Sequence, residues 1–336
     1  MSQETNKQPV DIRRRVLSLP TLIAFCIAAA FLAFMLTRFD VDLVGTWQRI
    51  RGANLWFYLL AFFINYTTFI FRGARWKVLL KNVQEPERPV PSTARLSGLI
   101  LLSWFANSIT WFRLGDAYRA YAYSEETRAS FSRTIGTVVA ERVYDVVLVF
   151  MLLVIAVLLL FLLRGQEPSW WFLGVALALV AGMGGVLLLM VLFRSRYVRL
   201  LPQRFEAVYN RFHTGTIGSF KNMPLALLFG ALGWLAEVGR LYFVVQALGL
   251  PLGVPMVLFV TLANAILTLV PLTPGGLGIV ESGVTGVLVL ALAQRDALSV
   301  ALLDRSISYV SVIIIGAAYF ILREAIRRRR AIRAQY

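Results

Sequence analysis

The sequence predicts an all-α fold: a polytopic membrane bundle of about six membrane-spanning helices and two re-entrant helical hairpins. Three observations predict it: an excess of apolar residues, apolar runs long enough to span a bilayer, and basic residues in the connections between these runs. The chain has 336 residues, of which 58% are hydrophobic and 15% are charged. Soluble domains contain about 45–50% apolar and about 25% charged residues. The apolar excess is therefore expected to face lipid.

Six apolar runs are long enough to cross the hydrocarbon core, which takes about 20 helical residues. They cover residues 18–37, 53–71, 140–163, 170–193, 224–248 and 300–322. The first run follows a basic segment, as a signal peptide does. It is longer than a typical signal-peptide core, and no small-x-small cleavage site follows Leu36. We therefore expect it to be retained as the first span.

Two further apolar segments are interrupted. Residues 96–112 contain polar side chains, and residues 254–293 are divided by Pro271-Leu272-Thr273-Pro274-Gly275-Gly276-Leu277-Gly278. Two prolines and three glycines in such a short run do not continue an α-helix. We expect both segments to form re-entrant hairpins, one from each face of the membrane. The alternative is a bundle of eight full spans.

The basic residues predict the orientation of the chain. Five regions are rich in Lys and Arg: the N-terminus, residues 72–95, 113–133 and 194–221, and the C-terminus. Cytoplasmic connections carry an excess of these residues. All five regions are cytoplasmic only if both interrupted segments are re-entrant. We expect a multi-pass plasma-membrane protein with cytoplasmic tails at residues 1–17 and 323–336, on either side of a membrane domain at residues 18–322.

The basic connections also indicate the partners of the chain. The formal net charge is +16, and Lys and Arg beside apolar runs usually contact lipid head groups. No base-stacking platform or recognition helix is visible, so we expect membrane lipids rather than nucleic acid as partners. Within residues 194–221, Phe205, Val208 and Phe212 have helical spacing and predict a helix lying in the membrane interface. A solvated loop is the alternative.

The sequence lacks the usual residues for metal or nucleotide cofactors. Its single histidine, His213, and single cysteine, Cys26, lie far apart, which makes a zinc site or a Ser-His-Asp triad improbable. Gly275-Gly276-Leu277-Gly278 lacks the Gly-Lys-Ser/Thr ending of a phosphate-binding loop. We therefore expect no cofactor and no metal.

Charged residues inside the apolar runs are the first candidates for a functional site, because a charge at bilayer depth usually faces a partner or a wet cavity. Glu237 and Arg240 lie one helical turn apart near the middle of residues 224–248. Spacing alone leaves two interpretations open: a structural pair buried between helices, or a polar site on a transport path.

The Pro/Gly interruption is the second candidate. A helix is expected to begin near Ile279, and its free N–H groups would favour an anion. Glu281 lies in the first turn of that helix and opposes an anion unless it caps the helix or pairs with an arginine. A plain extracytoplasmic turn is the alternative.

The remaining candidates lie near the predicted ends of the runs. They are Arg72, Arg75 and Trp76 after the second span; Asn107, Arg113, Gly115, Asp116 and Arg119 at the first hairpin; Glu141, Arg142 and Asp145; and Asp304 and Arg305. One interpretation places them at the membrane surface, where Arg and Trp anchor helices. The other places them along a path for a lipid head group.

Five motifs occur together in a fixed order along the chain. They are Arg72-x-x-Arg75-Trp76; Asn107 followed by Arg113-x-Gly115-Asp116-x-x-Arg119-x-Tyr121; Glu141-Arg142-x-x-Asp145; Pro274-Gly275-Gly276-Leu277-Gly278-x-x-Glu281; and Asp304-Arg305 followed by Tyr309. In this order they resemble the lysylphosphatidylglycerol synthase transmembrane region, also called the flippase-like domain family, over nearly the whole chain. The family pattern usually has proline where Trp111 stands and glutamate where Asp116 stands.

The resemblance implies lipid translocation. In two-part members of the family, this membrane region moves an aminoacylated phospholipid made by a separate C-terminal synthase domain. That domain is missing from this sequence, so the resemblance does not imply aminoacyl transfer. Some single-domain members are linked to glycolipid or polyprenyl-linked sugar metabolism.

We therefore expect translocation of a phospholipid or lipid-linked head group between leaflets. The resemblance and the charges place the path between the two hairpins. Arg113, Arg119, Arg142 and Arg240 would contact a phosphate there, and Glu237 and Glu281 would balance them or contact a cationic group. Two alternatives stay open: an intramembrane transferase or hydrolase using Asp116, Glu141 and Asp145, and a non-catalytic partner of a glycosyltransferase or lipid synthase. The substrate, direction, energy source and oligomeric state stay open as well.

Overall fold

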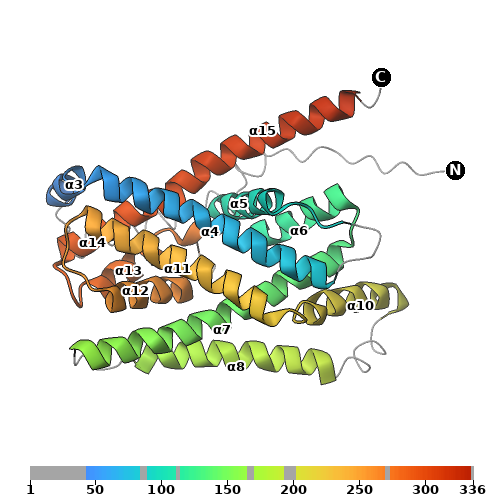
Figure 1. Cartoon of the computed structure of the whole chain (residues 1–336), viewed down its shortest axis with the longest axis horizontal. Coiled ribbons are helices and arrows are strands. Elements are labelled where there is room, and N and C mark those ends of the chain that lie inside the picture. Colours follow the sequence, from blue (N-terminus) through green and yellow to red (C-terminus); the bar gives the residue numbers. More distant parts are fainter. Residues whose placement is uncertain are drawn as a thin grey trace.

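The regular structure of the described chain is entirely helical (Figure 1). The computed structural model describes residues 43–83, 89–110, 114–164, 170–192, 202–268 and 273–333. The predicted all-α membrane bundle is confirmed for these residues. The predicted first span at residues 18–37 lies outside them, as do Trp111, Arg113 and Pro271.

Four helices of the described chain are long and apolar enough to cross a membrane. They are α4 (Leu55–Asn82), α7 (Phe131–Arg164), α11 (Met223–Ala247) and the continuous run of α14 (Gln294–Arg305), η2 (Ser306–Ser311) and α15 (Val312–Arg333). A further helix, α8 (Trp170–Leu192), is apolar along its length and packs against α7. These elements correspond to the five predicted spans that follow residue 42, and α15 continues as a helix into the predicted C-terminal tail.

The pair of α4 and α11 runs through the centre of the molecule (Figure 1) and forms its most extensive helix contact. Helix α4 continues beyond residue 71, the predicted end of the second span, to Asn82. Arg72 and Arg75 are buried within it, and Trp76 is buried as well, donating its indole N–H to the Thr137 hydroxyl at 3.0 Å. These three side chains therefore lie in the interior of the bundle.

Each interrupted segment lies in a pair of short helices, but the prediction of a hairpin within residues 96–112 is wrong: these residues form one helix up to Ile109, and the second helix of the pair lies in the basic segment 113–133. The first pair is α5 (Thr93–Ile109) and α6 (Leu114–Thr127), and the second is α12 (Val254–Leu267) and α13 (Ile279–Leu288) with the 3-10 turn η1 (Pro274–Gly276) between them. At 1.5 Å per residue, α12 and α13 are about 21 and 15 Å long, shorter than the hydrocarbon core of about 30 Å. The predicted interruption, and the predicted helix start near Ile279, are confirmed.

The hydrophobic side chains form two main clusters. The larger joins α7, α11, α12, α13 and α14 around residues such as Leu153, Val244 and Leu262. The second joins α4, α5 and α6 around Trp76, Leu96 and Leu99. Charged residues are buried alongside these clusters on α4, α6, α7, α11 and α14. The fold therefore brings polar groups from five helices into one region.

Two peripheral helices complete the described fold. The first, α3 (Leu43–Arg51), packs against α14, where Arg49 lies 3.3 Å from Asp296. The second, α10 (Gln203–Gly218), confirms the helix predicted within residues 194–221, and about half of the Phe205 and Val208 surfaces is exposed.

Close approach of α10 to the first turns of α7 depends on glycine. A Cβ atom at Gly215 would lie 2.1 Å from the Arg133 carbonyl oxygen, far inside contact distance. We predict that Gly215→Ala lowers the unfolding free energy by about 1–3 kcal/mol, the usual effect of overpacking. Thermal unfolding of the purified protein in detergent measures this.

Gly184→Ala is the matched control, because a Cβ atom there meets nothing within 4 Å in the described chain. Equal unfolding temperatures for the two variants would show that α10 does not pack on α7 in this way.

Candidate functional site

Ionised side chains from five helices meet inside the bundle. We call this set the ion-pair network; it contains Arg72 and Arg75 of α4, Asp116 and Arg119 of α6, Glu141, Arg142 and Asp145 of α7, Glu237 and Arg240 of α11, and Asp304 of α14. It consists of five arginines and five carboxylates. The formal charges of the network therefore cancel.

Arg75 is the centre of the first part of the network. Its guanidinium lies 2.9 Å from a Glu141 oxygen and 2.8 Å from an Asp145 oxygen. The other Glu141 oxygen lies 3.0 Å from Arg119. Because Glu141 and Asp145 are one turn apart on α7, a single arginine of α4 binds both of them. These two carboxylates therefore lie on one face of α7.

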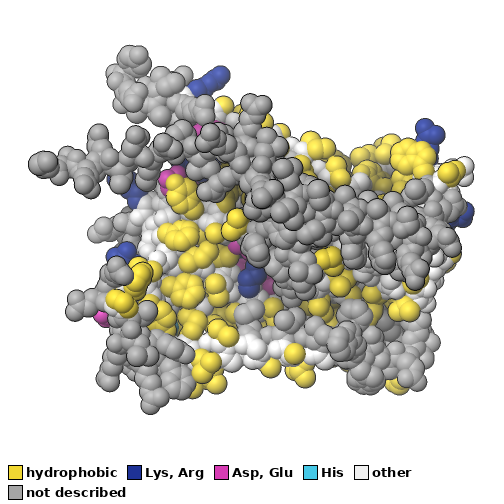
Figure 2. Space-filling model, turned by 180° about the vertical axis from the view of Figure 1, so that it is seen from behind, with side chains coloured by type: hydrophobic (Ala, Val, Ile, Leu, Met, Phe, Trp, Pro, Cys, Tyr) yellow, Lys and Arg dark blue, Asp and Glu magenta, His cyan; other side chains and the backbone are white. Residues whose placement is uncertain are grey.

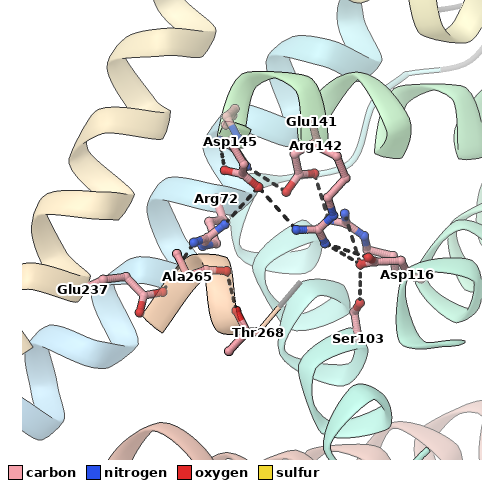
Figure 3. Close-up of polar contacts among 11 residues, drawn as sticks. Arg72, Ser103, Asp116, Glu141, Arg142, Asp145, Glu237, Ala265 and Thr268 are labelled. Carbon is pink, nitrogen blue, oxygen red and sulfur yellow. Dashed lines mark hydrogen bonds and ion pairs between the residues drawn. The ribbon is translucent and has the colours of Figure 1, made fainter. Parts of the chain in front are cut away.

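The rim of this part is formed by Asp116 and Arg142 (Figure 3). Arg142 lies 2.7 Å from Asp116 and 3.3 Å from Asp145. Asp116 also accepts a hydrogen bond from the Ser103 hydroxyl at 3.2 Å and lies 3.5 Å from Arg119. Together with Arg75 and Glu141, these residues form a closed ring of ion pairs between α4, α6 and α7.

The second part of the network surrounds Arg240. This guanidinium lies 2.9 Å from Glu237 and 2.7 Å from Asp304, and it donates to the Asn65 side-chain oxygen at 3.1 Å. The predicted pairing of Glu237 with Arg240 is confirmed, but Arg240 is also bound by two other helices. The pair is therefore a junction of α4, α11 and α14.

Arg72 joins the two parts. It lies 3.6 Å from Asp145 and 3.4 Å from Glu237, and Figure 3 shows it between these two carboxylates. Its guanidinium carbon also lies 5.3 Å from the ring centres of both Trp104 and Trp234. Arg72 thus connects α4 with α5, α7 and α11.

Burial distinguishes the rim of the network from its interior. The side chains of Arg142 and Asp116 are 25% and 17% exposed, whereas those of Arg75, Arg119 and Glu141 are at most 2% exposed. Glu141 and Asp145 are therefore buried between helices and do not lie on the surface of the protein. A buried charge is tolerated when it is paired and hydrogen-bonded, as these are.

Glu281 organises the Pro/Gly interruption. One carboxylate oxygen accepts the Gly278 N–H at 2.6 Å, and the other lies 2.6 Å from Arg305. Arg305 also donates to the Gly275 carbonyl at 2.8 Å. Glu281 therefore both caps the helix and pairs with an arginine, the two conditions under which it does not oppose an anion. Its own carboxylate occupies the helix start.

The interruption also contacts the first hairpin. Gly275 adopts a φ of 59°, and a Cβ there would lie 2.2 Å from the Tyr309 ring and 3.3 Å from Ser108. The Tyr309 hydroxyl donates to the Ser108 carbonyl at 2.9 Å. On the other side of the first hairpin, the Asn107 side chain accepts the Gly115 N–H at 2.8 Å. Residues 273–278 are thus packed between helices and are not a plain surface turn.

Asp304 and Arg305 precede the π-helix η2, which the sequence analysis did not predict. Tyr58 and Tyr66 of α4 are hydrogen-bonded to its serines, Ser306 at 3.0 Å and Ser311 at 2.8 Å. π-Helical turns are rare inside α-helices and are frequent at functional sites. This π-helical segment is therefore hydrogen-bonded to α4 beside the candidate site.

Sequence reasoning missed three residues of the site. Asn65 was available as a polar residue inside a predicted span, but Trp104 and Trp234 carry no signal that separates them from other aromatic residues of apolar runs. Among the described residues, no group of three His, Cys, Asp or Glu side chains is placed to hold a metal ion.

Comparison with known proteins places this site in a known membrane family. The family described as Lysylphosphatidylglycerol synthase TM region matches residues 21–316 of the chain. A UPF0104 membrane protein of Methanocaldococcus jannaschii is 32% identical over 228 residues, which cover 66% of this chain and 94% of that protein. A UPF0104 membrane protein of Methanothermobacter thermautotrophicus is 25% identical over 329 residues, covering 88% and 91%. A third, from Pyrococcus horikoshii, is 23% identical over 302 residues, covering 79% and 86%.

Breaking one buried ion pair should destabilise the bundle. We predict that Arg240→Gln lowers the unfolding free energy by about 3–5 kcal/mol, because it leaves the buried Asp304 unpaired. Asp304→Asn should lower it by less, because Arg240 keeps Glu237 at 2.9 Å. The double variant removes both charges, and Glu237 keeps Arg72 at 3.4 Å. Its loss should therefore be smaller than the sum of the single losses.

Chemical unfolding in detergent measures this double-mutant cycle. Additive losses would show that Arg240 and Asp304 do not interact. Arg49→Gln is the control, because Arg49 forms a half-exposed pair with Asp296, for which a change below about 1 kcal/mol is expected.

Proposed function

Because the chain belongs to the lysylphosphatidylglycerol synthase TM region family, we propose that it translocates a lipid with an anionic or zwitterionic head group between membrane leaflets. The observation that carries the proposal is the ion-pair network, which holds ten ionised groups inside an apolar helical bundle. Moving a head group through hydrocarbon is costly because its charge loses water. Buried groups of both signs would replace that water along a path through the protein.

Access to this path supports a lipid substrate. Figure 2 shows a small group of basic and acidic side chains near the centre of one face, with hydrophobic side chains around it. In the network, Arg142 and Asp116 are the most exposed members. A head group would enter at this rim, while the acyl chains stay in the bilayer. Arg113, predicted to join this rim, lies outside the described residues.

The path proposed here runs between the two hairpins. It leads from Asp116 and Arg142 past Arg119 to Glu237 and Arg240, and it ends near the interruption held by Glu281 and Arg305. Support comes from the contact of Gly275 and Tyr309 with the end of α5. Separation of the two hairpins would open this region to a head group.

The two alternative functions receive less support from the geometry. A transferase or hydrolase would need Asp116, Glu141 and Asp145 free for acid–base or metal chemistry. Instead, an arginine lies within 2.7 Å of Asp116, 2.9 Å of Glu141 and 2.8 Å of Asp145. No described feature favours a non-catalytic role beside a glycosyltransferase or lipid synthase, so translocation is the preferred function.

The topology proposed with this function has six full spans, two re-entrant hairpins and cytoplasmic termini in the plasma membrane. Support comes from the lengths of α12 and α13, and from the contact between α5 and α6. In a cysteine-free Cys26→Ser background, a membrane-impermeant maleimide should label Ser92→Cys and Ser130→Cys only after cells are permeabilised. These positions flank the first hairpin, and both are cytoplasmic in this topology.

The control is Gly52→Cys, between α3 and α4, which should be labelled in intact cells. Labelling of either Ser92→Cys or Ser130→Cys in intact cells would favour eight full spans and contradict the hairpin.

Translocation itself is testable in liposomes. A fluorescent phospholipid with a quenchable head-group label should flip at a rate that falls at least tenfold, or ~1.4 kcal/mol, in Glu237→Gln and Arg240→Ala. The physical reason is that each change removes a charge from the proposed path. Rates are normalised to monodisperse protein, and Arg49→Gln is the control. Wild-type rates in both variants would eliminate this site from the path.

A further inference from the structure

Arg72 is held differently from the other arginines of the network. Arg75, Arg119, Arg142 and Arg240 each have a carboxylate oxygen within 3.0 Å. Arg72 has none closer than 3.4 Å. Its Nε is buried and has no hydrogen-bond partner among the described residues, as is also true of the Nε atoms of Arg75 and Arg119, so the longer ion-pair contacts are what set Arg72 apart. Donors of this guanidinium are therefore available for another acceptor, although the residue is only 6% exposed.

Withdrawal of Arg72 from its two carboxylates would leave neither of them unpaired. Asp145 keeps Arg75 at 2.8 Å, and Glu237 keeps Arg240 at 2.9 Å. The same is not true of Arg240, because Asp304 has no other arginine within 4.0 Å among the described residues. An unpaired buried charge costs several kcal/mol. Recruiting Arg72 therefore leaves no carboxylate without an arginine and breaks no contact shorter than 3.4 Å, whereas every other arginine of the network has a contact of 3.0 Å or less.

The surroundings of Arg72 also orient it for an anion. Trp104 of α5 and Trp234 of α11 each lie 5.3 Å from the guanidinium carbon. Stacking on aromatic rings fixes the plane of a guanidinium and leaves its N–H groups free at the edge. A planar arrangement of donors matches two oxygens of a phosphate. Because Trp104 and Trp234 lie on different helices, movement of α5 away from α11 would open the site.

We infer that Arg72 binds the phosphate of the lipid head group at the junction of the two parts of the network. This inference rests on the proposed function, since it assigns one residue to the proposed path. Arg72 is a binding residue here, and Trp104 and Trp234 are positioning residues. Lysine in place of Arg72 keeps the charge but loses the planar fork and the stacking, so phosphate binding should weaken.

The experiment measures equilibrium binding to the full-length protein in detergent, where no translocation occurs. The probes are dihexanoyl phosphatidylglycerol and dihexanoylglycerol, which differ by the phosphoglycerol group. We expect Arg72→Lys to weaken binding of the phospholipid at least tenfold, or ~1.4 kcal/mol, and to leave binding of the diacylglycerol unchanged. Arg95→Lys, at a half-exposed pair with Glu126, is the matched control and should bind both probes as the wild type does.

Wild-type affinity of Arg72→Lys for the phospholipid would overturn the inference, and so would an equal loss for both probes. If Arg72→Lys does not fold, the double variant Trp104→Phe/Trp234→Phe is used in its place. It should weaken binding of the phospholipid and leave binding of the diacylglycerol unchanged. Unchanged binding of the phospholipid would overturn the inference. Phosphate-dependent binding without flipping in liposomes would remove only the proposed translocation. Flipping without dependence on Arg72 would remove only the present inference.

Discussion

Pairing of buried charges is the constraint on which this structure depends. Inside a bilayer the hydrophobic effect does not drive one apolar helix against another, so packing and polar contacts decide how helices associate. Here α4 contributes Arg72 and Arg75 to carboxylates of α7 and α11, while Arg240 binds α11 to α14. Each charge is tolerated only while its partners stay in place, so the positions of five helices depend on one another. A set with equal numbers of arginines and carboxylates satisfies this requirement without a net charge.

The network consists of two parts with short ion-pair contacts, joined by Arg72 through longer contacts. The same need to pair buried charges explains this arrangement. The shortest contacts of the ring around Arg75 and of the junction around Arg240 are 2.7–3.0 Å, and the ring also contains contacts of 3.3 and 3.5 Å. The contacts of Arg72 are 3.4 and 3.6 Å. Of these two units, the ring has three arginines and three carboxylates, whereas the junction has one arginine and two carboxylates, so Arg72 supplies the charge that balances the junction. The aromatic rings beside Arg72 keep this link shielded from lipid when the units are together.

Much of the fold could be predicted from the sequence, because hydropathy reports directly on membrane-spanning helices. The interruption at Gly275 and the pairing of Glu237 with Arg240 depend on local chemistry and spacing, and both were predicted. The roles of Arg72 and Arg75 were not, because an arginine at the end of an apolar run usually marks an interface. Their carboxylate partners lie on helices distant in sequence, at Asp145, Glu141 and Glu237. Contacts of that kind follow from tertiary packing and leave no periodic signal, which is also why Asn65, Trp104 and Trp234 were missed.

Comparison of contact strengths identifies the element that can move at the least cost. Among its described residues, α5 contributes no ionised member to the network, and its hydrogen bonds to the rest include Tyr309 to Ser108 and Ser103 to the Asp116 carboxylate. A neutral hydrogen bond contributes about 0.5–1.5 kcal/mol and one to a charged group about 1.5–3 kcal/mol, whereas breaking a buried ion pair costs about 3–5 kcal/mol. Displacement of α5 would also part Trp104 from Arg72 and Ser108 from Gly275. The first hairpin lies against both halves of the site; its helix α5 carries no ionised member of the network, whereas α6 carries Asp116 and Arg119. A head group that needs space between the hairpins would obtain it by moving α5.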